Sequence, residues 1–223
     1  MQNGPDDSKA ETLAELLEKA RHLETKGHFI EAESLWQEAI RAGSPEAAYH
    51  MGLIKERKQQ KAEAERYYRL AADRRSSDAM FALGLQNEDN NDLASAENWW
   101  TRASEADHGG AILKLAHLRE KQGDGPGAVK LYKRAAEQFG DPEAMNNLAI
   151  IYRNNYHFSL ALQWWRKAAS TGHSEAMANL GALLAELGRE EDALPWLEAA
   201  ARNGQEAAKR NLIRLRGRSG TND

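Results

Sequence analysis

The chain repeats one apolar pattern about every 32 residues. In each copy a large apolar residue lies four residues after one alanine and three residues before another. In chain order the large residues are Trp36, Tyr68, Trp100, Tyr132, Trp165 and Leu197. Successive members are 32 residues apart, except for one interval of 33. A fixed period of this length is typical of proteins in which each structural unit stacks on the next.

Each copy of the pattern contains two helical segments. The alanines and the large residue between them fall on one face of a helix, because residues three and four apart lie on the same side. A second segment follows, in which an alanine precedes a leucine or methionine by four residues, as in Ala79 and Leu83. Residues that favour helices, such as alanine, leucine, glutamate and lysine, occur throughout the chain. The sequence therefore predicts an all-α fold.

Turn residues separate the helical segments at regular places. In Gly43-Ser44-Pro45, glycine suits the end of one helix, serine the N-cap of the next and proline its first turn. The spacing predicts six antiparallel helix pairs and a C-terminal capping helix near 205–216, stacked as a right-handed α-solenoid, or superhelix. We expect the array to span residues 9–217, with disordered segments at 1–8 and 218–223.

The helix-pair pattern resembles that of tetratricopeptide repeats, with Leu83-Gly84 in a first helix and Ala96, Trp100 and Ala103 in a second. Residues 164–181 are similar to the Sel-one-like repeat, since they contain an aromatic pair, an alanine pair, a glycine and a later Leu-Gly. The turn inside each pair is short, as in tetratricopeptide repeats. The resemblance covers nearly all of residues 10–216, and it implies an adaptor or assembly scaffold for other proteins.

Composition argues against several other classes of protein. Thirty lysines and arginines against thirty-four aspartates and glutamates leave a net charge of −4, so we expect no nucleic-acid partner. The chain has no cysteine, which excludes disulfides and thiolate chemistry. No apolar run approaches the length of a membrane span, and the first residues lack the pattern of a signal peptide. We therefore expect no membrane association and a cytoplasmic location.

The sequence contains no pattern that predicts catalysis. The seven histidines lack the spacing of a metal site, and no glycine-rich phosphate loop occurs. We expect no catalytic residue, no metal site and no cofactor. His108 and His173 occupy the position of Ser44 at the start of a helix, which predicts that they cap helices. The regular spacing of Trp99-Trp100 and Trp164-Trp165 favours core packing over ligand stacking.

The resemblance to helical repeats suggests where a partner would bind. In such arrays the first helix of each pair lines the inner, concave face, and the residues two before and two after the leucine of the Leu-Gly position point into it. Arg153 lies further along the same face. The predicted partner-binding residues are Tyr49, Leu53, Phe81, Leu85, Leu113, His117, Asn146, Ile150 and Arg153.

The first five of these residues could form an apolar trough for a peptide or helix of a partner protein. Alternatively, they pack together because adjacent helices come close. For Asn146 and Arg153, solvated helix surface is the alternative to a polar contact with a partner. Two other functions stay open: a self-associating structural module, forming a homo-oligomer, or a regulatory domain of a larger protein. An enzyme is the least expected class.

Overall fold

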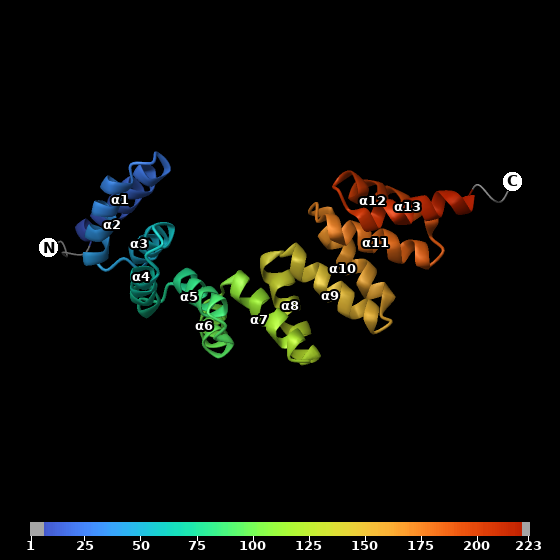
Figure 1. The fold of residues 1–223 in the computed structure, drawn as a ribbon, viewed down its shortest axis with the longest axis horizontal. Coiled ribbons are helices and arrows are strands. Elements are labelled where there is room, and N and C mark those ends of the chain that lie inside the picture. The colour runs from blue at the N-terminus through green and yellow to red at the C-terminus, as the bar shows by residue number, and fades with distance from the viewer. Residues whose placement is uncertain (1–6, 220–223) are drawn as a thin grey trace, which may run out of the picture. The chain divides into compact units, whose positions relative to one another are not determined.

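The computed structural model describes residues 7–219, and this range contains thirteen α-helices and no strand (Figure 1). The helices are α1 (Asp7–Thr25), α2 (Phe29–Arg41), α3 (Pro45–Arg57), α4 (Lys61–Asp73), α5 (Ser77–Asp89), α6 (Leu93–Glu105), α7 (Gly109–Lys121), α8 (Gly125–Phe139), α9 (Pro142–Asn154), α10 (Phe158–Ser170), α11 (Ser174–Glu186), α12 (Glu190–Arg202) and α13 (Glu206–Ser219). The prediction of an all-α repeat fold is confirmed. The helix number agrees with six pairs and one final helix.

The predicted ends of the array differ slightly from the observed ones. Helix α1 begins at Asp7 and α13 ends at Ser219, so the outermost residues of both helices fall within segments that we expected to be disordered. Their boundaries were wrong because the regular apolar spacing, on which the prediction rested, does not extend into them. The remainder of the predicted terminal segments, residues 1–6 and 220–223, lies outside the described residues.

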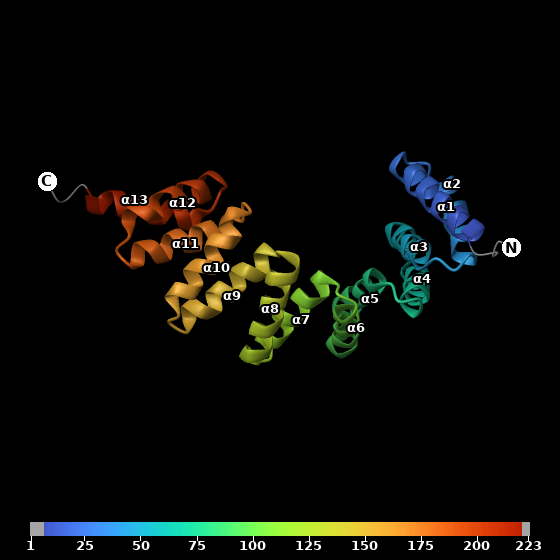
Figure 2. The ribbon, with the colours of Figure 1, turned by 180° about the vertical axis from the view of Figure 1, so that it is seen from behind.

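The chain divides into two compact units, residues 1–111 and 112–223. Within the first unit the described helices run from α1 to the start of α7, and within the second from the rest of α7 to α13. In each unit, consecutive helices joined by short turns pack as hairpins, which is also seen from the opposite side in Figure 2. The right-handed coiling of the whole array remains a prediction.

The repeated large residues form the core of both units, as predicted. In the first unit Trp36 packs with Ala39, Ala47 and Met51, all fully buried. In the second unit the core contains the last three repeated residues, Tyr132, Trp165 and Leu197. None of the six exposes more than 2% of its surface. The 32-residue period is therefore the period of the hydrophobic core.

A small residue on each first helix lets the large residue of the second helix come close. A Cβ atom added at Gly84 would lie 2.2 Å from the Trp100 ring, and one at Gly52 would lie 2.4 Å from the Tyr68 ring. At Gly181 the same atom would lie 2.6 Å from Leu197. These distances are far below van der Waals contact. Glycine at this position thus sets the separation of the two helices in a pair.

Side-chain caps start the first helix of several pairs. Ser44, Ser76 and Asp141 accept hydrogen bonds from the backbone N–H groups three residues later. His108 and His173 do the same through Nδ1, each at 3.1 Å from the amide nitrogen. The predicted capping role of the two histidines is confirmed. Because Nδ1 accepts in this geometry, the neutral ring carries its proton on Nε2.

We expect Gly84→Ala to destabilise the first unit by about 1–3 kcal/mol, because the new methyl group overlaps the buried Trp100 ring. Chemical denaturation measures this change in the free energy of unfolding. Gly125→Ala is the matched control, since a Cβ at this helical glycine meets no atom within 4 Å. Equal stabilities of the two variants would contradict the proposed role of the close contact.

Candidate functional site

Four of the predicted partner-binding residues lie on two first helices of the first unit. Tyr49 and Leu53 of α3 and Phe81 and Leu85 of α5 are all partly buried, and we call them the α3–α5 strip. The Tyr49 ring lies 5.8 Å from the Tyr68 ring, and Phe81 stacks on His108 at 4.4 Å between centroids. The side chains of the strip are thus partly covered by neighbours and partly exposed. Binding of a partner on them stays a prediction.

Carboxylates lie at both ends of the strip. Asp78, at the start of α5, has an oxygen 3.4 Å from Nε2 of His108. Glu56, near the end of α3, accepts a 2.8 Å hydrogen bond from the hydroxyl of Tyr68. Burial, followed by the charges of Asp78 and Glu56, raises the pKa of Tyr49 above its ordinary value. Two carboxylates thus lie close enough to the strip to act on Tyr49.

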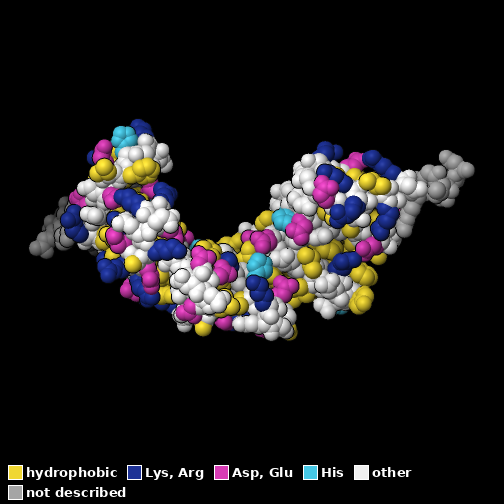
Figure 3. All heavy atoms as spheres, viewed as in Figure 1, with side chains coloured by type: hydrophobic (Ala, Val, Ile, Leu, Met, Phe, Trp, Pro, Cys, Tyr) yellow, Lys and Arg dark blue, Asp and Glu magenta, His cyan; other side chains and the backbone are white. Residues whose placement is uncertain are grey.

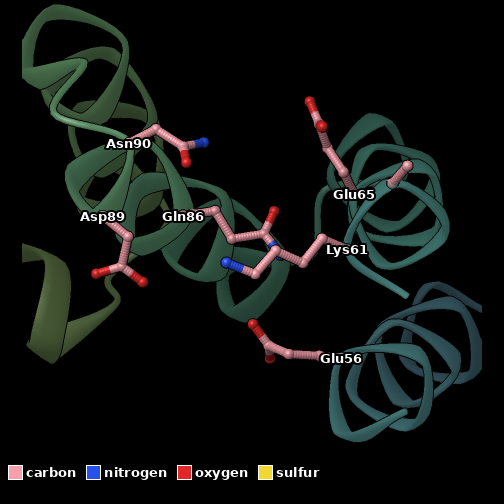
Figure 4. Close-up of a pocket in the computed structure, with 7 residues that line it drawn as sticks. Glu56, Lys61, Glu65, Gln86, Asp89 and Asn90 are labelled. Atoms are coloured by element: carbon pink, nitrogen blue, oxygen red, sulfur yellow. The ribbon is translucent and has the colours of Figure 1, made fainter. Parts of the chain in front are cut away.

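Two hollows lie near the ends of α3 and α5, and Tyr49 of the strip lines the first of them. At the start of α5 the hollow is lined by Pro45, Glu46, Tyr49, His50, Arg75, Ser76, Ser77 and Asp78. At the end of α5 it is lined by Glu56, Lys61, Ala62, Glu65, Gln86, Asp89 and Asn90 (Figure 4). We call this second one the Glu56–Asp89 hollow. It brings together the ends of α3 and α5 and the start of α4, and carboxylates predominate among its charged groups.

The remaining predicted residues lie in the second unit. Leu113 and Ile150 are partly buried and pack against its hydrophobic core. His117 lies with Nε2 3.0 Å from Nδ2 of Asn147 and 3.5 Å from Glu143. Leu113 belongs to a different unit from the α3–α5 strip, so the structure does not assign it to the same surface.

Arg153 is exposed at the end of α9. Its Nη2 atom lies 3.0 Å from each of the two carboxylate oxygens of Glu186 on α11. The guanidinium group therefore already has an anionic partner within the second unit. A partner carboxylate would have to compete with Glu186 for it.

The prediction that Asn146 lies on accessible surface is wrong. The residue is only 2% exposed, and its Oδ1 accepts hydrogen bonds from Nε1 of Trp165 at 2.9 Å and Nδ2 of Asn179 at 3.1 Å. For the buried indole N–H of Trp165, the asparagine on the neighbouring helix supplies the acceptor. Asn146 is a core residue and does not belong to the candidate site.

We expect Asn146→Ala to lower the stability of the second unit by about 1–3 kcal/mol, because the buried indole N–H of Trp165 loses its acceptor. Thermal or chemical denaturation measures the loss. Asn154→Ala, an exposed change on the same helix, serves as the control. If both variants unfold at the same denaturant concentration, the hydrogen bond is not what places Asn146 in the core.

The paired tryptophans belong mainly to the packing, as predicted. Trp164 is buried, with Nζ of Lys167 4.0 Å from its ring centroid. Trp99 is partly buried, and the guanidinium of Arg102 lies 4.3 Å from its ring. A cation over a ring stabilises an aromatic group that remains near solvent.

Sequence reasoning missed a repeated tyrosine–glutamate hydrogen bond. The Tyr68 hydroxyl donates to Glu56, and the Tyr132 hydroxyl donates to Glu120, both at 2.8 Å. Burial, and then the bond to the glutamate, raises the pKa of both tyrosines. The signal was present in the sequence, since each glutamate lies twelve residues before its tyrosine.

Charge and metal-ligand patterns give no second candidate. On the face drawn in Figure 3, cationic and anionic side chains are interspersed. Among residues 7–219, no group of three or more histidines, aspartates or glutamates is placed to hold a metal ion. Over the same described range, no helix has the length and apolar character needed to cross a bilayer.

The helix hairpins stack with one shared period, one shared core position and a small residue at each close contact. These features define a helical repeat protein. The tetratricopeptide repeat profile matches residues 17–79 and 113–172, more than half of the chain, and a second tetratricopeptide repeat profile matches residues 174–206. The chain belongs to the tetratricopeptide repeat family. Proteins with this fold generally serve as scaffolds for protein–protein interaction, and the family is generally non-enzymatic.

Solved structures with the same fold include proteins of both repeat types. The protective antigen c5321 of uropathogenic Escherichia coli, which displays an SLR fold, matches with a TM-score of 0.73 and 23% identity over 82% of this chain. This chain spans only 44% of that antigen. A Sel1 repeat protein from Oxalobacter formigenes gives a TM-score of 0.65 and 22% identity, covering 93% of this chain and 68% of its own.

A third similar structure is that of YrrB, a TPR protein with an unusual peptide-binding site. It matches with a TM-score of 0.56 and 19% identity, covering 80% of this chain and 97% of YrrB. No curated protein matches the chain. At these identities the solved structures establish the fold, which both the tetratricopeptide and the Sel1-type repeat share.

As the pH is lowered, we expect the free energy of unfolding of the first unit to decrease less in His108→Ser than in the wild type. Burial, opposed by Asp78, lowers the pKa of His108. The unfolded chain therefore binds a proton near pH 6.5 while the folded chain does not, so stability falls as pH drops through this value. Serine keeps the cap, as at Ser44 and Ser76.

The measurement is the free energy of unfolding at pH 7.5 and at about pH 5, below the ordinary histidine pKa. His22→Ser, an exposed change on α1, serves as the control. If His108→Ser and the wild type lose the same free energy between the two pH values, His108 does not contribute to the acid sensitivity.

Proposed function

We propose that this chain is a scaffold that binds a segment of a partner protein on the α3–α5 strip. The observation that carries the proposal is that four large apolar side chains keep exposed edges on two first helices, although separate residues fill the core. On α3 the core position is Met51, and on α5 it is Leu83, both fully buried. The four strip residues, Tyr49, Leu53, Phe81 and Leu85, are thus additional apolar surface, which often marks an interaction site.

The fold supports the same proposal. Helical repeats present their first helices side by side, so that one extended segment can contact several units. YrrB, a similar structure, is a TPR protein with a peptide-binding site, which supports peptide binding on this architecture. Leu113, His117, Ile150 and Arg153 would be a second contact surface, on the other unit. Asn146 takes no part in it.

Self-association is the alternative function. Ile213 on α13 is 73% exposed, and it occupies the position that glycine takes in Gly52, Gly84 and Gly181. Exposed apolar surface on this helix could contact a second copy. Light scattering at several concentrations would show a mass above that of one chain if this were the function. A cytoplasmic location stays a prediction from the sequence.

Photo-cross-linking tests the proposed scaffold function. A photoreactive phenylalanine replaces Leu85 in the strip or, as the control, Ile30 on α2, which is 87% exposed and lies outside the strip. In a lysate of the organism that encodes the chain, we expect Leu85 to capture a protein that Ile30 does not. Identical cross-linked proteins at the two positions, or none at Leu85, would contradict binding on the strip.

A further inference from the structure

Helix α5 is acidic at both ends. It carries Asp78 in its first turn and Glu88 and Asp89 at its end, and it has no basic residue in its last turn. Among the other first helices, α3, α7 and α9 have arginine in the last turn, whereas α11, like α5, has no basic residue there and ends at Glu186. Acidic residues at a helix C-terminus face the negative end of the helix dipole, which disfavours them. Local helix stability therefore does not explain this arrangement.

The acidic end of α5 lies beside the apolar strip. Asp89 is four residues after Leu85, and Glu56 is three residues after Leu53, so each carboxylate follows a strip residue by about one helical turn. Both carboxylates line the Glu56–Asp89 hollow, which has a volume of about 300 Å³ (Figure 4). Gln86, the residue after Leu85, also lines the hollow, so the hollow begins next to the last residue of the strip.

The charged groups of the hollow differ in their internal partners. Glu56 is held by the Tyr68 hydroxyl, and Glu65 pairs with Arg69 at 2.7 Å. Asp89 is exposed, and its carboxylate makes no hydrogen bond or ion pair within the described part of the chain. Lys61 is the single cation among the lining residues. With Arg69 counted as the partner of Glu65, three carboxylates against two cations leave the hollow with a net negative charge.

Resting on the scaffold function above, we propose that the α3–α5 strip binds a peptide segment of another protein in which apolar side chains are followed, about one helical turn later, by an arginine or lysine. The apolar side chains lie against Leu53 and Leu85, and the cation enters the Glu56–Asp89 hollow. A guanidinium or ammonium group there pairs with the carboxylate of Asp89 and approaches that of Glu56.

Charge complementarity distinguishes this occupant from others. An acidic segment would place like charges together, which costs free energy and slows association. A nucleic acid is a polyanion and meets the same repulsion. The apolar contact supplies most of the affinity, and the cation supplies selectivity and a dependence on salt.

Synthetic peptides test this specificity. The first is a short amphipathic helix with two leucines one turn apart, followed a turn later by arginine. In two matched peptides, glutamine or glutamate replaces the arginine. Fluorescence anisotropy with the full chain, at low ionic strength and at about 0.15 M salt, measures the dissociation constants. We expect the arginine peptide to bind most tightly and the glutamate peptide most weakly, with a difference that narrows as salt is added.

Charge-reversal variants locate the cation. We expect Asp89→Lys to weaken binding of the arginine peptide roughly tenfold, because an attraction becomes a repulsion. The free energy of unfolding of the Asp89→Lys variant should be unchanged or higher, since lysine suits a helix C-terminus. Asp73→Lys is the matched control, because Asp73 is also exposed and is the last residue of α4, outside the hollow. If Asp89→Lys and Asp73→Lys weaken binding of the arginine peptide equally, the Glu56–Asp89 hollow is not the place where the cation binds.

A third variant separates this inference from the scaffold function. If the three peptides bind equally well and Leu85→Ser weakens them all, the strip binds peptides but does not select a cation, and only the inference fails. If Leu85→Ser leaves binding unchanged, the strip is not the site and both proposals fail. No binding of any peptide at about 1 mM would overturn the inference, while cross-linking at Leu85 still decides the scaffold function.

Discussion

The structure depends on one repeated contact, in which a large side chain of a second helix lies against a small residue of the first. At Gly84 the space that a Cβ would occupy is filled by the Trp100 ring, and at Gly52 by that of Tyr68. Close approach brings many atoms into van der Waals contact, so a pair of thirteen-residue helices can bury a continuous core. Stacking of equivalent pairs then extends this core along each unit.

Because the core is built from a few fixed positions, the polar ends of its large residues determine some of their neighbours. The Tyr68 hydroxyl holds Glu56 at the border of the α3–α5 strip, whereas the indole N–H of Trp165 draws Asn146 into the core. The large residue at this one position of the repeat thus donates a hydrogen bond to a surface carboxylate in one helix pair and to a buried side-chain amide in another. This variation gives individual pairs different surfaces on a constant framework.

The surface that we propose for function uses positions that the core leaves free. On α3 and α5 these positions hold large apolar residues, and on α5 they are followed by acidic residues that the helix dipole disfavours. Repeat proteins tolerate such local costs, because each pair is stabilised mainly by its neighbours and not by its own helix propensity. Binding specificity can therefore change from pair to pair without a change of fold.

The sequence by itself determined the helices, their caps and the buried positions, because these depend on local periodicity and on spacings of a few residues. It identified Trp36 and Trp165 as core residues and His108 as a cap, and the structure confirms all three. Only the tertiary structure decided that Asn146 is buried, that Leu53 and Leu85 are partly buried and that Glu56 and Asp89 share a hollow. These properties depend on contacts between residues 19 to 33 positions apart, such as those of Asn146 with Trp165 and Asn179, and a helical period within one segment carries no information about them.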